Sequence, residues 1–122
     1  MLEAVQEAQL REHGGAFGIR DAGLLESTLA RPRQKFEYAQ ERGLGVLAAA
    51  YVFGIAKNHP FVDGNKRAAF MAAYVFLGLN GRDVDVAEPD VVRTVERVAA
   101  GEMSEAQLGA WFQTKVRKID DA

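Results

Sequence analysis

Two apolar segments with a short polar junction between them constrain the fold of this chain more than any other feature. Residues 44–57 (LGVLAAAYVFGIAK) are apolar on every face of a helix, and residues 65–79 (NKRAAFMAAYVFLGL) are the same after a charged start. A helix that is apolar all round is buried on most sides. We therefore predict two central, buried helices, with the polar junction held close to the core.

The N-terminal part of the chain is predicted to add two further helices. Apolar residues recur at roughly helical spacing in residues 2–10. Asp21 suits the N-cap of a second helix over residues 22–30. Pro32 is expected to stop that helix, because proline lacks the N–H that a helix interior uses. The polar stretch 33–42 is interpreted as a loop or irregular flap.

The C-terminal part is predicted to hold a short extended piece and two amphipathic helices. Asn80-Gly81 closes the second central helix in a turn, and residues 83–86 are expected to be extended. Pro89 suits the first residue of a helix that Gly101 ends. Ser104 begins a capping box for a last helix. The inward residues of that helix are expected to be Leu108, Trp111, Phe112 and Val116. The fold class that follows is all-α, a single domain over residues 1–122 with about six helices.

Composition and charge exclude several classes of protein. The 122 residues fit one domain, and the absence of cysteine excludes disulfides and thiolate metal sites. The net charge of −2 argues against a wholesale basic surface for nucleic acid. The N-terminus lacks the basic and apolar regions of a signal peptide. The uncharged stretch 43–56 is shorter than the roughly 20 residues that span a bilayer. We therefore expect a cytoplasmic protein.

The polar junction is predicted to be a phosphate-handling active site. Gly64 and Asn65 open the second central helix, and a helix N-terminus presents unpaired N–H groups and the positive end of the dipole to an anion. Gly64 has no side chain, so a phosphate can approach the backbone closely. Lys66 and Arg67 add two cations beside the same terminus. Cations there oppose the helix dipole, which favours a bound anion.

His59 and Asp63 supply the other chemical groups of the junction. The ordinary pKa of a histidine, about 6.5, suits a general base near neutral pH. A carboxylate next to a phosphate site suits a magnesium ion held between the two. Base, carboxylate and anion site together indicate nucleotide-dependent transfer onto a hydroxyl. Each group also has an ordinary structural explanation. His59 can bond a backbone carbonyl, Asp63 can serve as a turn and cap residue, and Lys66 and Arg67 can be solvated charges.

The string His59-Pro60-Phe61-Val62-Asp63-Gly64-Asn65-Lys66-Arg67 resembles the signature of the Fic/Doc superfamily, and is most similar to its Doc (death-on-curing) branch. Fic enzymes carry HPFx[DE]GNGRxxR. Lys66 stands where they have a second glycine, and Phe70 where they have a second arginine. The segments 13–15, 18–27 and 30–32 also resemble the N-terminal half of Doc proteins, which usually have a few more residues before the point where this chain begins.

The resemblance implies a kinase toxin that phosphorylates a threonine of elongation factor Tu with ATP and Mg2+, opposed by a Phd-like antitoxin. By motif position, His59 is the base that activates the target hydroxyl and Asp63 holds magnesium. The resemblance also implies that Gly64, Asn65 and Lys66 form an anion-binding nest and that Arg67 binds phosphate. Lys66 further suggests that ATP lies reversed, with its gamma-phosphate exposed. Two alternatives remain: a Fic-type AMP transferase, and a catalytically inactive module that only binds the antitoxin.

Overall fold

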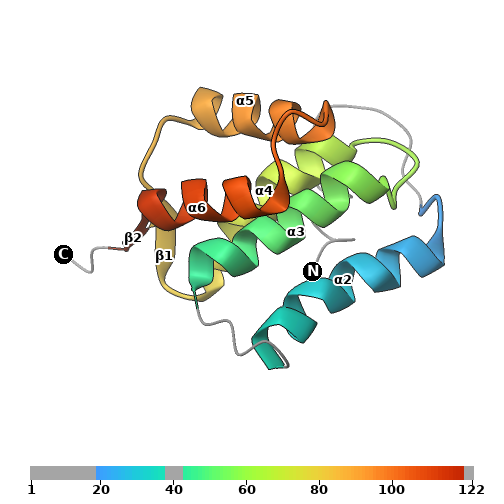
Figure 1. The fold of residues 1–122 in the computed structure, drawn as a ribbon, viewed down its shortest axis with the longest axis horizontal. Coiled ribbons are helices and arrows are strands. Elements are labelled where there is room, and N and C mark those ends of the chain that lie inside the picture. The colour runs from blue at the N-terminus through green and yellow to red at the C-terminus, as the bar shows by residue number, and fades with distance from the viewer. Residues whose placement is uncertain (1–18, 38–42, 120–122) are drawn as a thin grey trace.

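The computed structural model of this protein describes residues 19–37 and 43–119. The predicted helix over residues 2–10 lies outside these ranges. In chain order the elements are α2 (Ala22–Glu37), α3 (Leu44–Asn58), α4 (Asn65–Leu79), β1 (Arg82–Val84), α5 (Glu88–Ala99), α6 (Glu105–Lys115) and β2 (Val116–Lys118) (Figure 1). The described part of the chain is therefore predominantly helical, which confirms the all-α class.

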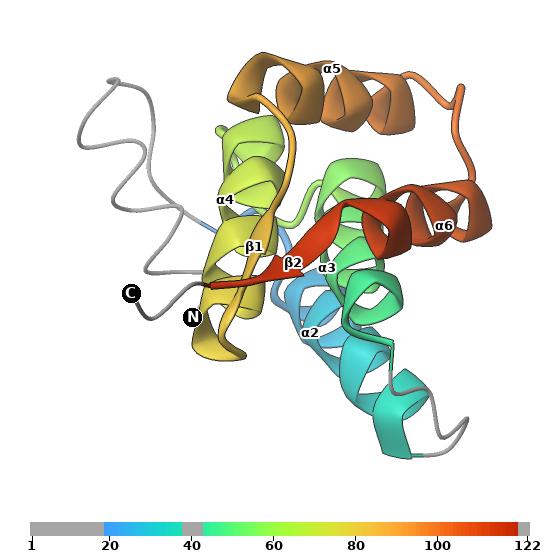
Figure 2. The ribbon, with the colours of Figure 1, turned by 90° about the vertical axis from the view of Figure 1, so that its left-hand side faces the viewer.

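Helix α3 forms the centre of the molecule. It packs against α2, α4, α5 and α6, and the two ribbon views agree on this arrangement (Figures 1 and 2). Its alanines and glycines let the neighbouring backbones approach closely. A Cβ added at Gly45 would lie 2.6 Å from the backbone nitrogen of Gln113 in α6, and one at Gly54 would lie 3.0 Å from Cγ2 of Thr28 in α2. The prediction that this segment forms a buried central helix is confirmed.

Helix α4 is the second central helix and has the predicted boundaries, residues 65–79. The inward face of α4 carries Ala68, Ala69, Ala72, Ala73 and Leu77, all fully buried. The turn at Asn80-Gly81 follows as predicted, and Gly81 adopts a left-handed conformation with φ of 69°.

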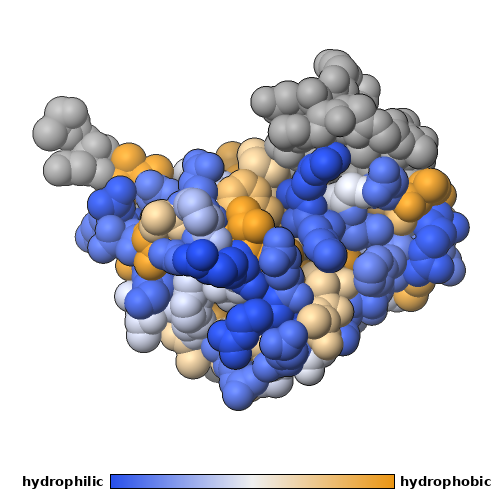
Figure 3. All heavy atoms as spheres, turned by 90° about the horizontal axis from the view of Figure 1, so that it is seen from above, coloured by the Kyte–Doolittle hydropathy of each residue, from blue (hydrophilic) through white to orange (hydrophobic). Residues whose placement is uncertain are grey.

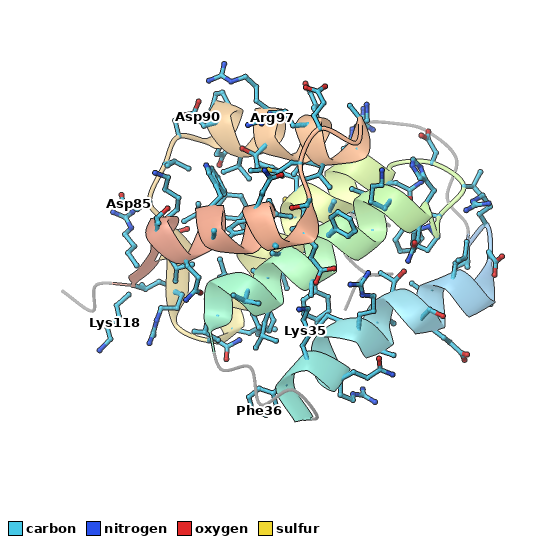
Figure 4. All side chains as sticks on the ribbon, in the orientation of Figure 1. Lys35, Phe36, Asp85, Asp90, Arg97 and Lys118 are labelled. Carbon is cyan, nitrogen blue, oxygen red and sulfur yellow. The ribbon has the colours of Figure 1, made fainter. Side chains whose placement is uncertain are left out.

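The prediction that Pro32 stops the second helix is wrong. Helix α2 continues through Pro32 to Glu37, so residues 33–37 are helical rather than a flap, and residues 38–42 lie outside the described ranges. Proline removes one backbone hydrogen bond of a helix interior, but Pro32 is itself buried, and its packing offsets that loss. Tertiary contacts also hold this end, because Arg31 and Lys35 both form ion pairs with Glu105 of α6. Lys35 lies between α2 and α6 (Figure 4).

The extended piece predicted at residues 83–86 is confirmed in part as β1. Its partner is β2, with Arg82 opposite Lys118 and Val84 opposite Val116 in an antiparallel pair. Val116 therefore lies in a strand, and its assignment to the last helix was wrong. The reason is a long-range backbone pairing: the N–H of Asp85 donates to the carbonyl of Lys115 at 2.6 Å, just where α6 ends.

The ends of α5 and α6 follow local sequence signals closely. Helix α5 begins one residue earlier than predicted, so Pro89 is its second residue, and Gly101 follows its end with φ of 80°. Ser104 and Gln107 form the predicted capping box. The Ser104 hydroxyl accepts from the N–H of Gln107 at 3.1 Å, and the side-chain oxygen of Gln107 accepts from the N–H of Ser104 at 2.9 Å. Among the residues in ranges 19–37 and 43–119, no helix has the length and apolarity to cross a membrane.

Candidate active site

The junction between α3 and α4 is built from two left-handed turns. Helix α3 ends at Asn58, and His59 follows with φ of 49° and ψ of 57°. It is the one non-glycine residue with positive φ among the described residues. Gly64 supplies the second turn, with φ of 76°, and α4 begins directly after it. These two turns place the loop and the first turn of α4 next to each other.

The buried side chain of Asn65 closes this loop. Its Oδ1 accepts from the N–H of Phe61 and its Nδ2 donates to the carbonyl of Phe61, both at 3.1 Å. The rings of Phe61 and Pro60 are fully buried, so they fasten the loop to the core. The Asn65 side chain therefore has a positioning role, and it is the backbone of this residue that remains for an anion.

A segment distant in sequence holds the loop from the other side. Nε of Arg20 donates to the carbonyl of His59 at 2.6 Å, and a terminal nitrogen of its guanidinium donates to the carbonyl of Asn58 at 2.7 Å. The N–H of Arg20 bonds the carbonyl of Pro60 at 2.8 Å, and Ile19 forms an isolated β-bridge with Phe61. The guanidinium thus braces the backbone that carries the His59 imidazole.

Helix α2 gives the same junction a further support. Thr28 is fully buried, donates to the carbonyl of Leu24 at 2.7 Å, and accepts from Nδ2 of Asn58 at 3.1 Å. Asp21 caps α2, since its Oδ1 accepts from the N–H of Leu24 at 3.1 Å, as predicted. The neighbouring Arg20 side chain bonds the carbonyls of Asn58 and His59.

The N-terminus of α4 is open toward the loop. Its N-cap is Gly64, which has no side chain to accept from the first N–H groups of the helix, and the first backbone bond of α4 runs from Ala68 to the Gly64 carbonyl at 2.8 Å. The N–H groups of the first helical residues have no partner within the helix, as at any helix start. Lys66 and Arg67 are exposed beside them. This terminus has the donors and the charge that an anion requires.

Asp63 lies at the entrance to this terminus. Its carboxylate accepts from the N–H of Gly64 at 2.8 Å, which fixes one oxygen near the start of α4. In the ranges 19–37 and 43–119, no group of three or more metal-binding side chains encloses an ion by itself. Magnesium commonly takes one or two protein carboxylates and completes its shell with water and phosphate oxygens. A single oriented carboxylate next to an anion site fits that ion.

A pocket of about 380 Å³ continues from the cationic residues along α4. It lies between α4 and α5, and its lining residues are Lys66, Arg67, Phe70, Glu88, Val92, Val95 and Glu96. Phe70 is half-buried, and its ring centroid lies 5.1 Å from that of Tyr74. The two cations beside the start of α4 therefore also line a partly apolar pocket.

All six residues predicted to form the site lie in the α3–α4 junction and the first turn of α4. The sequence prediction missed the supporting residues Arg20, Thr28 and Asn58. The one local signal near these residues is the N-cap at Asp21, which does not reveal the contact of Arg20 with the loop. The arrangement places an imidazole, a carboxylate, open helix donors and two cations in one connected segment. Such groups can take a proton from a hydroxyl and hold a phosphate chain.

Comparison with known proteins gives consistent matches. A model of the Fic/DOC family matches residues 1–77. The chain is 45% identical over 83 residues to Toxin Doc of Mycolicibacterium smegmatis, covering 62% of this chain and 63% of that protein. It is 32% identical over 103 residues to Protein kinase doc of Escherichia phage P1, covering 84% of this chain and 81% of that protein. The chain thus spans slightly less than two thirds of the length of the first relative.

Proposed function

Because the chain belongs to the Fic/DOC family, we propose that it is a Doc-type toxin that transfers the gamma-phosphate of ATP to a protein hydroxyl. The observation that carries the proposal is the start of α4. It opens at Gly64 without a side-chain cap, and Lys66 and Arg67 lie beside its free donors. The names of the two relatives, Toxin Doc and Protein kinase doc, support the same class of activity.

Each residue of the junction has a role in this proposal. The His59 imidazole would take the proton from the target hydroxyl as its oxygen attacks the gamma-phosphorus, and the bond from that phosphorus to the bridging oxygen would break so that ADP leaves. The backbone of Gly64, Asn65 and Lys66 binds phosphate oxygens, and the Arg67 guanidinium pairs with them. Asp63 holds Mg2+. When bound, ATP supplies the phosphoryl group and Mg2+ neutralises phosphate charge. Arg20 braces the left-handed backbone of His59, the residue that carries the proposed base.

The partners of the proposed toxin follow from the same family membership. We propose a threonine of elongation factor Tu as the acceptor and a Phd-like antitoxin as the inhibitor. Since that acceptor is a cytoplasmic protein of the translation machinery, the proposed site of action is the cytoplasm, and the expected outcome is arrested translation.

The decisive test is the mass change of the acceptor. We expect that incubation of the protein with ATP, Mg2+ and elongation factor Tu adds one phosphate to the acceptor, whereas His59→Ala protein adds none. Addition of AMP instead would make the chain a Fic-type AMP transferase. If His59→Ala protein remains as toxic to cells as the parent, a non-catalytic binding module is the better description.

A further inference from the structure

Helix α5 carries opposite charges on its two flanks. The flank toward α4 has the carboxylates of Glu88 and Glu96, which line the pocket described above. The flank toward α6 has Arg93 and Arg97, which lie about one turn apart and line a second pocket of about 370 Å³. Figure 4 labels Arg97 on α5, which runs above α6 in that view. The two pockets share no lining residue, so this α5–α6 pocket is separate from the candidate active site.

Two cations of the α5–α6 pocket have no counter-charge among the described residues. Arg93 forms an ion pair with Asp90, which also lines the pocket. Arg97 lines the pocket from α5 and Lys115 from α6, and neither forms an ion pair with a residue in the ranges 19–37 and 43–119. Arginine and lysine side chains only donate hydrogen bonds. A ligand that contacts both must therefore supply acceptors, and an anion with about two negative charges balances them.

Trp111 gives the same pocket an aromatic surface. Its ring packs edge-on against the fully buried Phe112, with the ring centroids 5.1 Å apart and the planes at 77°. The indole is therefore anchored to the core and loses little conformational freedom when a ligand binds. Figure 3, which views the molecule from the side of α5, shows hydrophilic side chains around small apolar areas. An indole beside unneutralised cations suits a ligand that joins a flat ring to an anionic group.

We propose that the α5–α6 pocket binds a small phosphate monoester that carries an aromatic ring, namely a nucleoside monophosphate. A phosphate monoester has a charge of about −1.5 to −2 at pH 7, which matches Arg97 and Lys115 together. A guanidinium can hold two phosphate oxygens with parallel hydrogen bonds, and the ring can lie against Trp111. The pocket volume, about 370 Å³, falls within the range of small-molecule sites, roughly 300–1,000 Å³.

A small ligand fits this site better than a nucleic acid strand does. Arg117 follows Lys115 by two residues, but it forms ion pairs with Asp83 and Asp85 at 3.5 and 3.3 Å. It is therefore not available to a second phosphate beyond the pocket. The net charge of −2 also disfavours a polymer that carries many phosphates. The inference goes beyond the proposed function and does not depend on it.

The fluorescence of Trp111 tests the inference directly. It is the only tryptophan of the chain, so its emission reports the α5–α6 pocket and not the start of α4. Titration of the protein with AMP, with excitation at the long-wavelength edge of the indole band, should give a saturable change in emission. We expect adenosine and inorganic phosphate each to bind at least about tenfold more weakly, because each offers only one half of the ligand.

Charge reversal identifies the residues that hold the phosphate. We expect Arg97→Glu and Lys115→Glu each to weaken AMP binding on the order of tenfold. Arg33→Glu is the matched control, because it makes the same change in charge at an exposed position of α2, which does not border the pocket. This control should leave AMP affinity unchanged. Melting temperatures close to that of the parent check that the variants are folded.

Several results would overturn the inference. Trp111 emission that does not change up to about 10 mM AMP would show that the pocket is not a site for this ligand. Equal affinities for adenosine and AMP would show that the phosphate is not recognised. Tighter binding of a hexaglutamate peptide than of AMP would make the pocket a surface for acidic protein segments. Folded Arg97→Glu and Lys115→Glu proteins with the parent's AMP affinity would place the ligand elsewhere. None of these results bears on phosphate transfer, so the proposed function is judged by its own test.

Discussion

Arg20 offers the sharpest test of how the candidate site is held together. Its guanidinium donates to the carbonyls of His59 and Asn58 at 2.6 and 2.7 Å, and it braces a histidine in a left-handed conformation. Such a conformation costs a non-glycine residue about 1–3 kcal/mol. Hydrogen bonds from a charged group contribute about 1.5–3 kcal/mol each when well shielded and less when exposed, as here. The free energy contributed by the two Arg20 hydrogen bonds is therefore similar in size to the free-energy cost of the left-handed His59 conformation.

Removal of the brace should let His59 leave its left-handed conformation. We expect Arg20→Ala to shift this local equilibrium by about 1–2 kcal/mol, which changes the ratio of the two conformations by roughly 5- to 30-fold. The rate constant kcat should fall by up to that factor, because only the left-handed conformation is competent. The KM for ATP should change little, since Lys66 and Arg67 are untouched. Arg20→Lys should restore part of the loss, because lysine keeps a charged donor but not the two-nitrogen geometry.

A matched variant separates this effect from general destabilisation. Asp21→Ala removes the N-cap of α2, at a cost of about 1 kcal/mol in stability, without removing either contact of Arg20 with α3. We expect Asp21→Ala to lower the melting temperature but to preserve kcat. The Cα chemical shift of His59 reports the left-handed conformation directly and does not depend on any assay of transfer. An Arg20→Ala protein with unchanged kcat and an unchanged His59 shift would refute the reasoning.

The remaining predictions concern packing and buried polar groups. Gly45→Ala should destabilise the protein by at least about 1–3 kcal/mol, because its Cβ would lie 2.6 Å from the Gln113 nitrogen. Gly78→Ala should stabilise the protein by roughly 0.5–1 kcal/mol, because no described residue lies within 4 Å of its added Cβ. Urea unfolding of the two variants measures this difference in stability. Asn65→Ala should lower the free energy of unfolding by roughly 2–4 kcal/mol, because the buried N–H and carbonyl of Phe61 lose their partners. The same change should reduce the binding of phosphate-containing ligands. An unchanged melting temperature in calorimetry would contradict the prediction. Tyr74→Phe should raise stability by about 1 kcal/mol, because the buried Tyr74 hydroxyl has no hydrogen-bond partner among the residues that the structure describes. Burial, and then the nearby carboxylates, raise the pKa of Tyr74 above its ordinary value of 10.0. The unfolded chain therefore loses this proton first, so stability falls as the pH rises above about 10, and melting curves of the Tyr74→Phe variant should show a smaller alkaline loss.

Much of the helical framework was determined by local sequence. The boundaries of α4, the turn at Asn80-Gly81 and the capping box at Ser104 were predicted correctly. In each case the deciding physics acts within a few residues: an apolar run, a turn-forming pair, or a side chain that reaches its own backbone. The candidate site was visible for the same reason. Its chemical groups, from His59 to Arg67, are contiguous in the chain.

Contacts between distant segments decided the rest. Helix α2 continues past Pro32 because its last turns are tied to Glu105 of α6, and Val116 pairs with β1 instead of extending α6. Arg20 braces the α3 carboxyl end from a position 39 residues away from His59. The pocket exists only because α5 lies alongside the first turns of α4. The sequence by itself identified the chemical groups of the candidate site. Only the tertiary structure decided how they are held, because the free energy of those contacts depends on residues that no local pattern brings together.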